Sequence, residues 1–224
     1  MRWSLILILA LLVIPIAQVG CVRIVNPPIT SLMLLRSAEA RLAGQTPAPR
    51  RYQWIDRARI PQIFLRCVIA SEDQRFFQHH GFDWKEMKIA ERDAERRGRP
   101  PRGASTISMQ CARSLFLWQG RSWIRKGLEA YYTFWMELFL PKRRIVELYA
   151  NVIEMGDAVY GIEAASQAHF GTSARALKRE QAAMLAAILP NPREWNPQHP
   201  SPALSARAAR ILREEASLKL PPAF

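Results

Sequence analysis

The chain begins with an apolar run that constrains how its first residues can fold. From Trp3 to Val19 the sequence reads WSLILILALLVIPIAQV, about seventeen residues without a charge. A helix of this length lies near the lower limit for spanning the hydrocarbon of a bilayer, and Pro15 is tolerated in such a helix. We therefore expect a single transmembrane helix within residues 1–22 that is retained as a membrane anchor.

Two alternatives compete with a retained anchor. A short basic start and the small residues Ala17 and Gly20 after the apolar run are also typical of a cleaved signal peptide. The QVGC ending at Cys21 is similar to a lipoprotein cleavage box, although Gln18 stands where that pattern prefers Leu. Cleavage would leave a shortened mature chain without the anchor.

The rest of the chain is long enough for one folded domain and strongly basic. The 224 residues leave room for one domain of roughly 180 to 200 residues after the membrane segment. Lys and Arg number 32 against 19 Asp and Glu. Much of the excess lies in local clusters: Arg92, Arg96, Arg97, Arg99 and Arg102, then Arg125 and Lys126, then Lys142, Arg143 and Arg144. Such clusters attract phosphates of nucleic acid, anionic lipid or a pyrophosphate substrate, and a merely solvated basic face is the alternative.

The apolar pattern predicts a mainly α fold. We expect a juxtamembrane helix (Ile29–Ala43) and a linker (Gln45–Arg51) within residues 23–51, and the folded domain over residues 52–224. Period-two alternation is nearly absent. Helical apolar spacing predicts further helices at Ile60–Ala70, Trp123–Leu140, Lys142–Asn151, Gly161–Phe170, Ser173–Leu189 and Pro202–Leu218. Cys67 and Cys111 have no zinc-like spacing and are expected to be two separate buried thiols.

An acidic stretch, SEDQRFFQHHGFDW at Ser71–Trp84, requires explanation in so basic a chain. A structural interpretation is available, because Ser71 and Gln74 fit a capping box that would place Glu72 and Asp73 in the first turn of a helix. Helical spacing would also put Glu72, Phe76 and His79 on one face, as an edge of the core. Taken alone, the stretch favours these structural roles.

The stretch is the first of a series of short motifs. Phosphate-binding loops, dinucleotide-binding glycine patterns and serine nucleophile elbows are absent from the sequence. The motifs that remain are SEDQRFFQHHG, GASTISMQ, RKGLE, KRRIVELYAN and GDAVYGIEAASQAHFG. Each is weak alone, and RKGLE could be an ordinary pair of Arg125 and Glu129 on a solvated helix face.

In order and spacing, the motifs resemble the five signature motifs of the peptidoglycan glycosyltransferases of family 51, the lysozyme-like polymerases of bacterial cell walls. The resemblance runs from near Ile60 to Pro197, about two-thirds of the chain. The first motif is met by Glu72, Asp73, Phe76, His79 and Gly81, and the second by Gly103, Ser105, Thr106 and Gln110. The third is met by Arg125, Lys126 and Glu129, and the fourth by Lys142, Ile145, Glu147, Tyr149 and Asn151. Because transpeptidase motifs are lacking, the chain looks like the monofunctional, membrane-anchored form.

The resemblance implies a substrate and a reaction. The enzyme would polymerise lipid II, a disaccharide-pentapeptide on undecaprenyl pyrophosphate, with β-1,4 links and inversion, on the outer face of the cytoplasmic (inner) membrane. It would serve peptidoglycan biosynthesis and cell shape, with partners among other cell-wall synthesis or division proteins and no nucleic acid. Glu72 is the expected general base, and Glu129 the second catalytic carboxylate, which would position basic groups or the acceptor sugar.

The remaining site residues are assigned to substrate. Pyrophosphate would be held by Arg125 and Lys126, together with Arg113 and Lys142, whereas Ser105, Thr106 and Gln110 would contact the donor strand. Asp73 would orient its neighbours or cap a turn, and the fourth motif adds Glu147 and Asn151 to the substrate-binding set. His79 is expected to be a packed, hydrogen-bonded histidine. A metal-ligand cluster is not evident, although Mg²⁺ or Mn²⁺ could assist pyrophosphate departure.

Departures from the family pattern leave the reaction type unchanged. Met109 stands where a Gln is frequent, Ser114 where Asn is usual and Ala150 where Leu is usual. His169 and Thr172 replace the Tyr and Lys of the fifth motif. Two other functions compete with polymerisation: a lysozyme-like lytic enzyme acting on finished peptidoglycan, and a non-enzymatic membrane protein that binds anionic lipid through its charge clusters.

Overall fold

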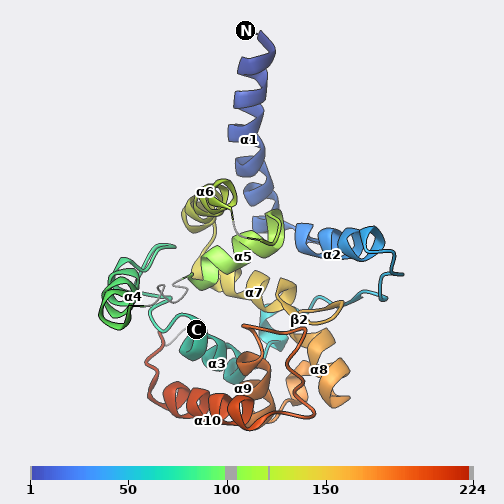
Figure 1. Cartoon of the computed structure of the whole chain (residues 1–224), viewed down its shortest axis with the longest axis vertical. Helices are drawn as coiled ribbons and strands as arrows, with labels where there is room; N and C mark the ends of the chain where they lie inside the picture. The colour runs from blue at the N-terminus through green and yellow to red at the C-terminus, as the bar shows by residue number, and fades with distance from the viewer. Residues whose placement is uncertain (1, 99–104, 121, 222–224) are drawn as a thin grey trace.

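The computed structural model describes residues 2–98, 105–120 and 122–221 and is mainly helical, as predicted (Figure 1). Arg99, Arg102 and Gly103, the last being the first residue of the second motif, lie outside these residues. The helices are α1 (Arg2–Ile24), α2 (Ser31–Leu42), α3 (Gln62–Glu72), α4 (Trp84–Arg97), α5 (Ile107–Phe116), α6 (Trp123–Phe139), α7 (Lys142–Val152), α8 (Ile162–Phe170), α9 (Arg179–Ala187) and α10 (Pro202–Ser217), with 3₁₀ turns η1 (Arg57–Arg59) and η2 (Ala174–Ala176).

A small sheet that the sequence did not predict accompanies the helices. Its strands are β1 (Arg51–Tyr52), β2 (Glu154–Gly156) and β3 (Val159–Tyr160), in the order β1-β3-β2. β1 pairs parallel with β3, and β2 pairs antiparallel with β3. Strands of two or three residues are too short to show alternation, so their absence from the sequence prediction has a simple cause.

The first helix projects from the body of the molecule, and its C-terminal end packs against α6 (Figure 1). Val19 and Val22 are buried there, and the Tyr132 hydroxyl donates to Gln18 Oε1. Arg144 of α7 donates from Nε and Nη2 to the carbonyl of Val22, at 3.0 Å each. In the part of the chain that the structure describes, none of the helices is long and apolar enough to cross a membrane.

Two helix groups build the core and bring the site together. α3 packs against α9 and α10, whereas α5 packs against α6 and α7. The buried faces of α3 and α5 are apolar at helical spacing: Phe64, Leu65, Val68 and Ile69 on the first, and Ile107, Cys111, Ala112 and Leu115 on the second. Burial of each large apolar side chain contributes about 1.5–3 kcal/mol. This burial fixes the end of α3 relative to the start of α5.

The capping-box interpretation of the acidic stretch is wrong. α3 begins after Pro61 and ends at Glu72, so the acids follow the last turn of a helix. Ser71 Oγ donates to the carbonyl of Val68 at 3.2 Å, and Gln74 Nε2 donates to that of Ala70 at 3.0 Å. Both side chains therefore satisfy carbonyls at a helix C-terminus. The segment beyond Asp73 is a series of turns, which also excludes the proposed helical face.

Most other helix predictions are confirmed, with one division. The expected helix over Ser173–Leu189 is split into η2 and α9, because Lys178 is extended and starts α9 as its N-cap. Glu163 Oε2 accepts the Ala174 N–H at 2.9 Å and fixes η2 separately. Cys67 and Cys111 are buried and free, as expected.

Candidate active site

Glu72, the last residue of α3, is held between two donors from other helices. Its Oε2 accepts from Gln110 Nε2 at 3.0 Å, and its Oε1 accepts from Arg207 Nη2 at 3.3 Å. The side chain is only 13% exposed. Burial raises the pKa of Glu72, while the Gln110 hydrogen bond and the Arg207 charge oppose the shift. A carboxylate with a raised pKa is suited to accepting a proton near neutral pH.

A tyrosine fixes the orientation of the Gln110 amide. The Tyr149 hydroxyl donates to Gln110 Oε1 at 3.0 Å, which leaves the amide N–H groups to face Glu72. Tyr149 is fully buried, and burial followed by the Glu72 charge raises its pKa well above the usual value. The phenol therefore stays protonated and remains a donor. Gln110, which is predicted to contact the donor strand, donates from its amide to Glu72 in this structure.

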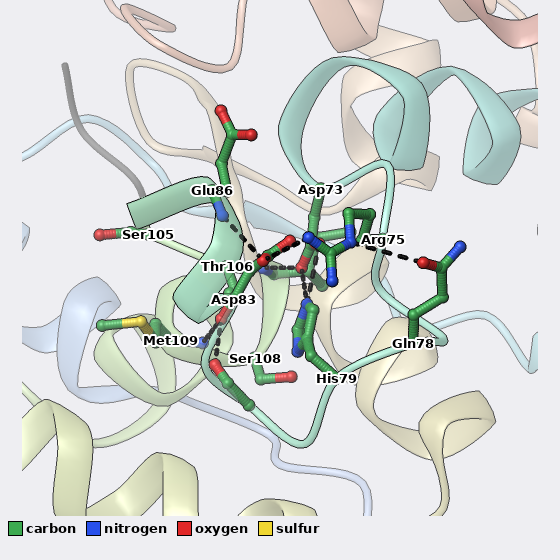
Figure 2. A network of polar contacts seen from close by, with 12 residues as sticks. Asp73, Arg75, Gln78, His79, Asp83, Glu86, Ser105, Thr106, Ser108 and Met109 are labelled. Atoms are coloured by element: carbon green, nitrogen blue, oxygen red, sulfur yellow. Dashed lines mark hydrogen bonds and ion pairs between the residues drawn. The ribbon is translucent and has the colours of Figure 1, made fainter. Parts of the chain in front are cut away.

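Asp73 links the end of α3 to the start of α5 (Figure 2). Its Oδ2 accepts the Ile107 N–H at 3.0 Å, and His79 Nε2 lies 2.9 Å from Oδ1. Both side chains are buried, as expected for His79. A carboxylate at a helix N-terminus satisfies a free N–H and complements the helix dipole. Asp73 therefore caps α5 and orients His79.

Thr106 joins the start of α5 to the turn that contains Gly81. Thr106 Oγ1 accepts the Met109 N–H at 3.2 Å as the N-cap of α5, and donates to the Gly81 carbonyl at 2.7 Å. Gly81 has a φ of +88°, and a Cβ there would lie 2.8 Å from Thr133 Cγ2 and 2.9 Å from Glu137 Cγ. Only glycine tolerates both the backbone conformation and the contact with α6.

A second carboxylate, Glu129 of α6, gathers the cations of the third motif. Its side chain is fully buried and is paired with Arg125, with Lys126 at 2.7 Å and with Arg113 at 3.9 Å. The interpretation of RKGLE as a solvated face is therefore wrong. Lys126 also donates to Ser105 Oγ at 3.3 Å. Its side chain stays 41% exposed and that of Arg113 28%, so both cations can reach an anionic ligand.

Lys142 lies in a separate polar cluster. Its Nζ is 2.7 Å from Glu137 Oε1 and 4.4 Å from the centre of the Phe76 ring, and Ser108 donates to the same Glu137 oxygen. Burial lowers the pKa of Lys142, and the Glu137 charge opposes this shift. The ammonium is thus charge-compensated within the protein.

Glu147 and Asn151, the other two residues from the fourth motif, are used inside the protein. Glu147 Oε1 accepts the Arg57 backbone N–H at 2.8 Å, and Glu147 Oε2 forms an ion pair with Arg144 Nη1 at 2.8 Å. Asn151 accepts the Ile55 N–H at 2.9 Å, and donates to the carbonyls of Ile55 at 3.0 Å and Glu147 at 2.9 Å. Both side chains fasten the segment before α3 onto α7.

A cleft of about 320 Å³ opens beside the two acids. It includes Glu72 and Asp73 from the end of α3, Ser105 and Thr106 from the start of α5, and Arg210 of α10. The cations around Glu129 do not line this cleft, although Lys126 contacts Ser105 at its edge. An elongated substrate could therefore lie along the start of α5 and meet the acids and the cations at different points.

One group of side chains near the cleft has the composition of a metal site, but its carboxylates and His79 Nε2 already have partners within the protein. Ligand atoms of Asp73, His79 and Asp83 lie within 4.8 Å of one another. Asp83 Oδ1 accepts the Glu86 N–H at 3.0 Å and pairs with Arg75 at 3.1 Å (Figure 2). With a guanidinium, a histidine and backbone N–H groups on the carboxylates, the group is a poor fit for a divalent cation.

Sequence reasoning missed two groups that contact the predicted site. Arg207 on α10 reaches Glu72 from 135 residues away along the chain, and Glu137 compensates Lys142. The sequence around Arg207, SARAARILREE, is an ordinary amphipathic helix with several arginines. It carries no local signal that selects one of them. Tyr149 was part of the fourth motif, but its spacing did not reveal a contact with Gln110.

The fold and site define a helical protein with a buried, hydrogen-bonded glutamate beside a polar cleft and an ion-paired cluster of cations. The family model described as Transglycosylase matches residues 39–216, and the chain belongs to this family. The chain is 46% identical over 217 residues to a protein named biosynthetic peptidoglycan transglycosylase from Xylella fastidiosa (strain M12). The aligned region covers 97% of this chain and 89% of the relative. The chain is 44% identical over 218 residues to one of the same name from Xanthomonas campestris pv. campestris (strain B100), and that alignment covers 97% of this chain and 88% of the relative.

Proposed function

We propose that the protein is a peptidoglycan glycosyltransferase that polymerises lipid II, with Glu72 as the general base. Membership of the transglycosylase family and the names of the relatives support the reaction. The observation that carries the proposed role of Glu72 is its position: a buried carboxylate beside the cleft, held by Gln110 and Arg207.

The chemistry requires a base more than an acid. A sugar hydroxyl is a weak nucleophile, so its attack on the anomeric carbon needs a carboxylate within hydrogen-bonding reach. Glu72 takes the proton of the acceptor 4-hydroxyl as the new bond forms. The leaving group is a pyrophosphate, which needs its charge neutralised. Direct displacement converts an α-linked donor into a β-1,4 link with inversion.

Two of the cations around Glu129 are suited to the pyrophosphate. Lys126 and Arg113 are partly exposed, whereas Arg125 is 7% exposed and also donates from Nε to the Gly120 carbonyl at 2.7 Å. Glu129 therefore acts as the fixed counter-charge that holds the cations in place before substrate binds. Arg125 holds Glu129 in place within the protein, whereas Lys126 and Arg113 contact the phosphates directly.

Membrane association is part of the proposal. The outer side of α6 exposes Ile124 (76%), Phe134 (52%) and Leu138 (60%), and Trp123 at its start is 92% exposed. Contact of this apolar side of α6 with a lipid surface would keep the domain next to a lipid-linked substrate. We propose a single anchor over Trp3–Val19 with the domain on the outer face of the cytoplasmic membrane. Protease added to intact spheroplasts should digest the domain, and N-terminal sequencing separates a retained anchor from a cleaved signal.

The test of the proposed function is turnover of lipid II by Glu72→Gln. Gln keeps the size of Glu but cannot accept the hydroxyl proton, and loss of a general base costs roughly 10²- to 10⁴-fold in rate. Glu91→Gln, on the exposed side of α4, is the matched control and should polymerise at the wild-type rate. Circular dichroism and a thermal melt establish that both variants are folded.

The outcomes separate the competing functions. Long glycan strands from lipid II with wild type, and less than about a hundredth of that rate with Glu72→Gln, support the proposal. A folded Glu72→Gln protein that keeps more than a tenth of the wild-type rate removes Glu72 from the role of base. Cleavage of finished peptidoglycan without any polymerisation identifies a lytic enzyme. Salt-sensitive lipid binding without turnover identifies a binding protein.

A further inference from the structure

Two hydrogen bonds fix the Arg207 side chain, one to Glu72 and one to a backbone carbonyl. Nη2 donates to Glu72 Oε1 at 3.3 Å, and Nε donates to the Ala187 carbonyl, at the end of α9, at 3.0 Å. The side chain is 23% exposed. A guanidinium held by a backbone carbonyl has little freedom to leave the carboxylate, because its planar donors keep a fixed geometry.

The helix that carries Arg207 is itself clamped to the helix that ends in Glu72. Two turns beyond Arg207, the nearly buried Glu215 of α10 pairs with Arg66 of α3, and Arg66 also donates from Nη2 to the carbonyls of Glu215 at 2.8 Å and Leu218 at 3.1 Å. Arg179 of α9 pairs with the same carboxylate at 2.8 Å. α3 and α10 are therefore joined by two ion pairs of opposite sense, one of which includes Glu72.

We propose that Arg207 is a positioning residue that holds the Glu72 carboxylate ionised and correctly oriented for the reaction. This inference rests on the proposed role of Glu72 as base. It makes the C-terminal helix α10 part of the catalytic arrangement, although α10 lies outside every motif named above.

The charges around Glu72 decide the sign of the effect. Burial favours the neutral acid, and the Asp73 charge on the same turn does so too. Gln110 and Arg113 from α5, and Arg207 from α10, favour the carboxylate. Tyr149 of α7 stays neutral. Removal of Arg207 therefore raises the pKa of Glu72, and less of the base is ionised at a given pH.

The experiment is the pH profile of kcat/KM for lipid II in the full-length protein. The variants are Arg207→Ala, Arg207→Gln and Arg207→Lys, with Arg213→Ala as matched control, because Arg213 is an exposed arginine on the same helix. An opposite charge at this distance shifts a carboxyl pKa by about 1–3, and partial exposure of Arg207 favours the lower end. We expect the acidic limb of Arg207→Ala and Arg207→Gln to move up by about one pH unit, with about a tenfold loss on the limb and recovery at high pH. Arg207→Lys should restore most of the wild-type profile, and Arg213→Ala should match it.

A second measurement separates failure of this inference from failure of the proposed function. The side-chain carboxyl of Glu72 is titrated by ¹³C NMR in glutamate-labelled protein, with the signal assigned by its loss in Glu72→Gln. An upward move in Arg207→Ala or Arg207→Gln supports the ion pair whether or not Glu72 is the base. An unchanged titration, or an activity loss that is equal at every pH and not restored by Arg207→Lys, overturns the inference and leaves Arg207 a packing residue. If Arg207→Ala is unfolded in the melt, Arg207→Gln and Arg207→Lys decide the question.

Discussion

Asn151 offers a sharp test of whether a motif residue serves the substrate or the fold. The perturbation is Asn151→Asp, which keeps the size of the side chain and the acceptor for the Ile55 N–H. It removes the two donations to the carbonyls of Ile55 and Glu147, at 3.0 and 2.9 Å, in a fully buried position. The Ile55 carbonyl loses its side-chain donor, which costs about 1–3 kcal/mol. The Glu147 carbonyl lies within α7 and loses only an additional hydrogen bond, worth about 0.5–1.5 kcal/mol, so we expect a loss of about 1.5–4.5 kcal/mol in the free energy of unfolding.

The loss should depend on pH in a direction that identifies its cause. At neutral pH the introduced carboxyl group either stays charged in a buried place or is kept neutral because burial strongly raises its pKa. Either state costs free energy of unfolding. Below about pH 4 the group is protonated in the unfolded chain as well, and in the folded chain it can donate one hydrogen bond. The difference from wild type should therefore shrink as the pH falls.

Urea denaturation followed by circular dichroism measures this difference, with KM for lipid II measured on the same samples. Asn196→Asp is the control, because it makes the same change at an exposed position. A typical domain is stable by about 5–15 kcal/mol, so the expected loss is easily measured. Unfolding within about 1 kcal/mol of wild type, together with a raised KM, would refute the structural argument and place Asn151 on the substrate.

Two further predictions concern the support of the site. Gly81→Ala should lower the free energy of unfolding by about 2–5 kcal/mol, from its left-handed backbone and from overpacking against α6, whereas Gly98→Ala should lose only about 1 kcal/mol. The control is matched because Gly98 also has a positive φ, of +58°, but a Cβ added there would meet no atom within 4 Å; equal losses in thermal melts would contradict the contact. Glu215→Gln should destabilise by roughly 1.5–3 kcal/mol at pH 7. Burial opposes ionisation of Glu215, but its hydrogen bonds with arginine lower its pKa in the folded protein. The stabilisation by this ion pair is therefore present above the unfolded pKa near 4.3 and is lost as the pH falls through the folded pKa. A Glu215→Gln difference that does not change between pH 7 and pH 3 would exclude the ion pair as its source.

The sequence predicted most of the helices, because apolar spacing is a local property, but it gave no prediction of a helix for α4 or α5. It could not predict whether a polar pattern belongs to the N-terminus of one helix or to the C-terminus of another. Ser71 and Gln74 satisfy the spacing of an N-terminal capping box, yet both serve carbonyls at the end of α3. The same residue types can bond carbonyls as well as N–H groups, so the pattern alone is ambiguous.

Long-range contacts account for the rest. The pair of Arg125 and Glu129 was visible at helical spacing, but its burial depends on α5, which brings Arg113 to the same carboxylate. Arg207 meets Glu72 only because α10 is packed on α3 and α9. Such contacts follow from how helices pack, and a single sequence carries no marker for one arginine among several on a helix.

The contrast between Glu72 and Asp73 explains why adjacent acids favour different roles. Asp73 accepts a backbone N–H of Ile107 and faces His79, so protonation of its carboxylate would weaken the cap of α5. The donors on Glu72 are instead the ends of two long side chains, Gln110 and Arg207, and among the described residues no backbone N–H donates to it. Glu72 can therefore gain and lose a proton with little cost to the backbone around it. A base must change its protonation state in every cycle, and this difference favours Glu72 for that role, with Asp73 holding the corner on which the base depends.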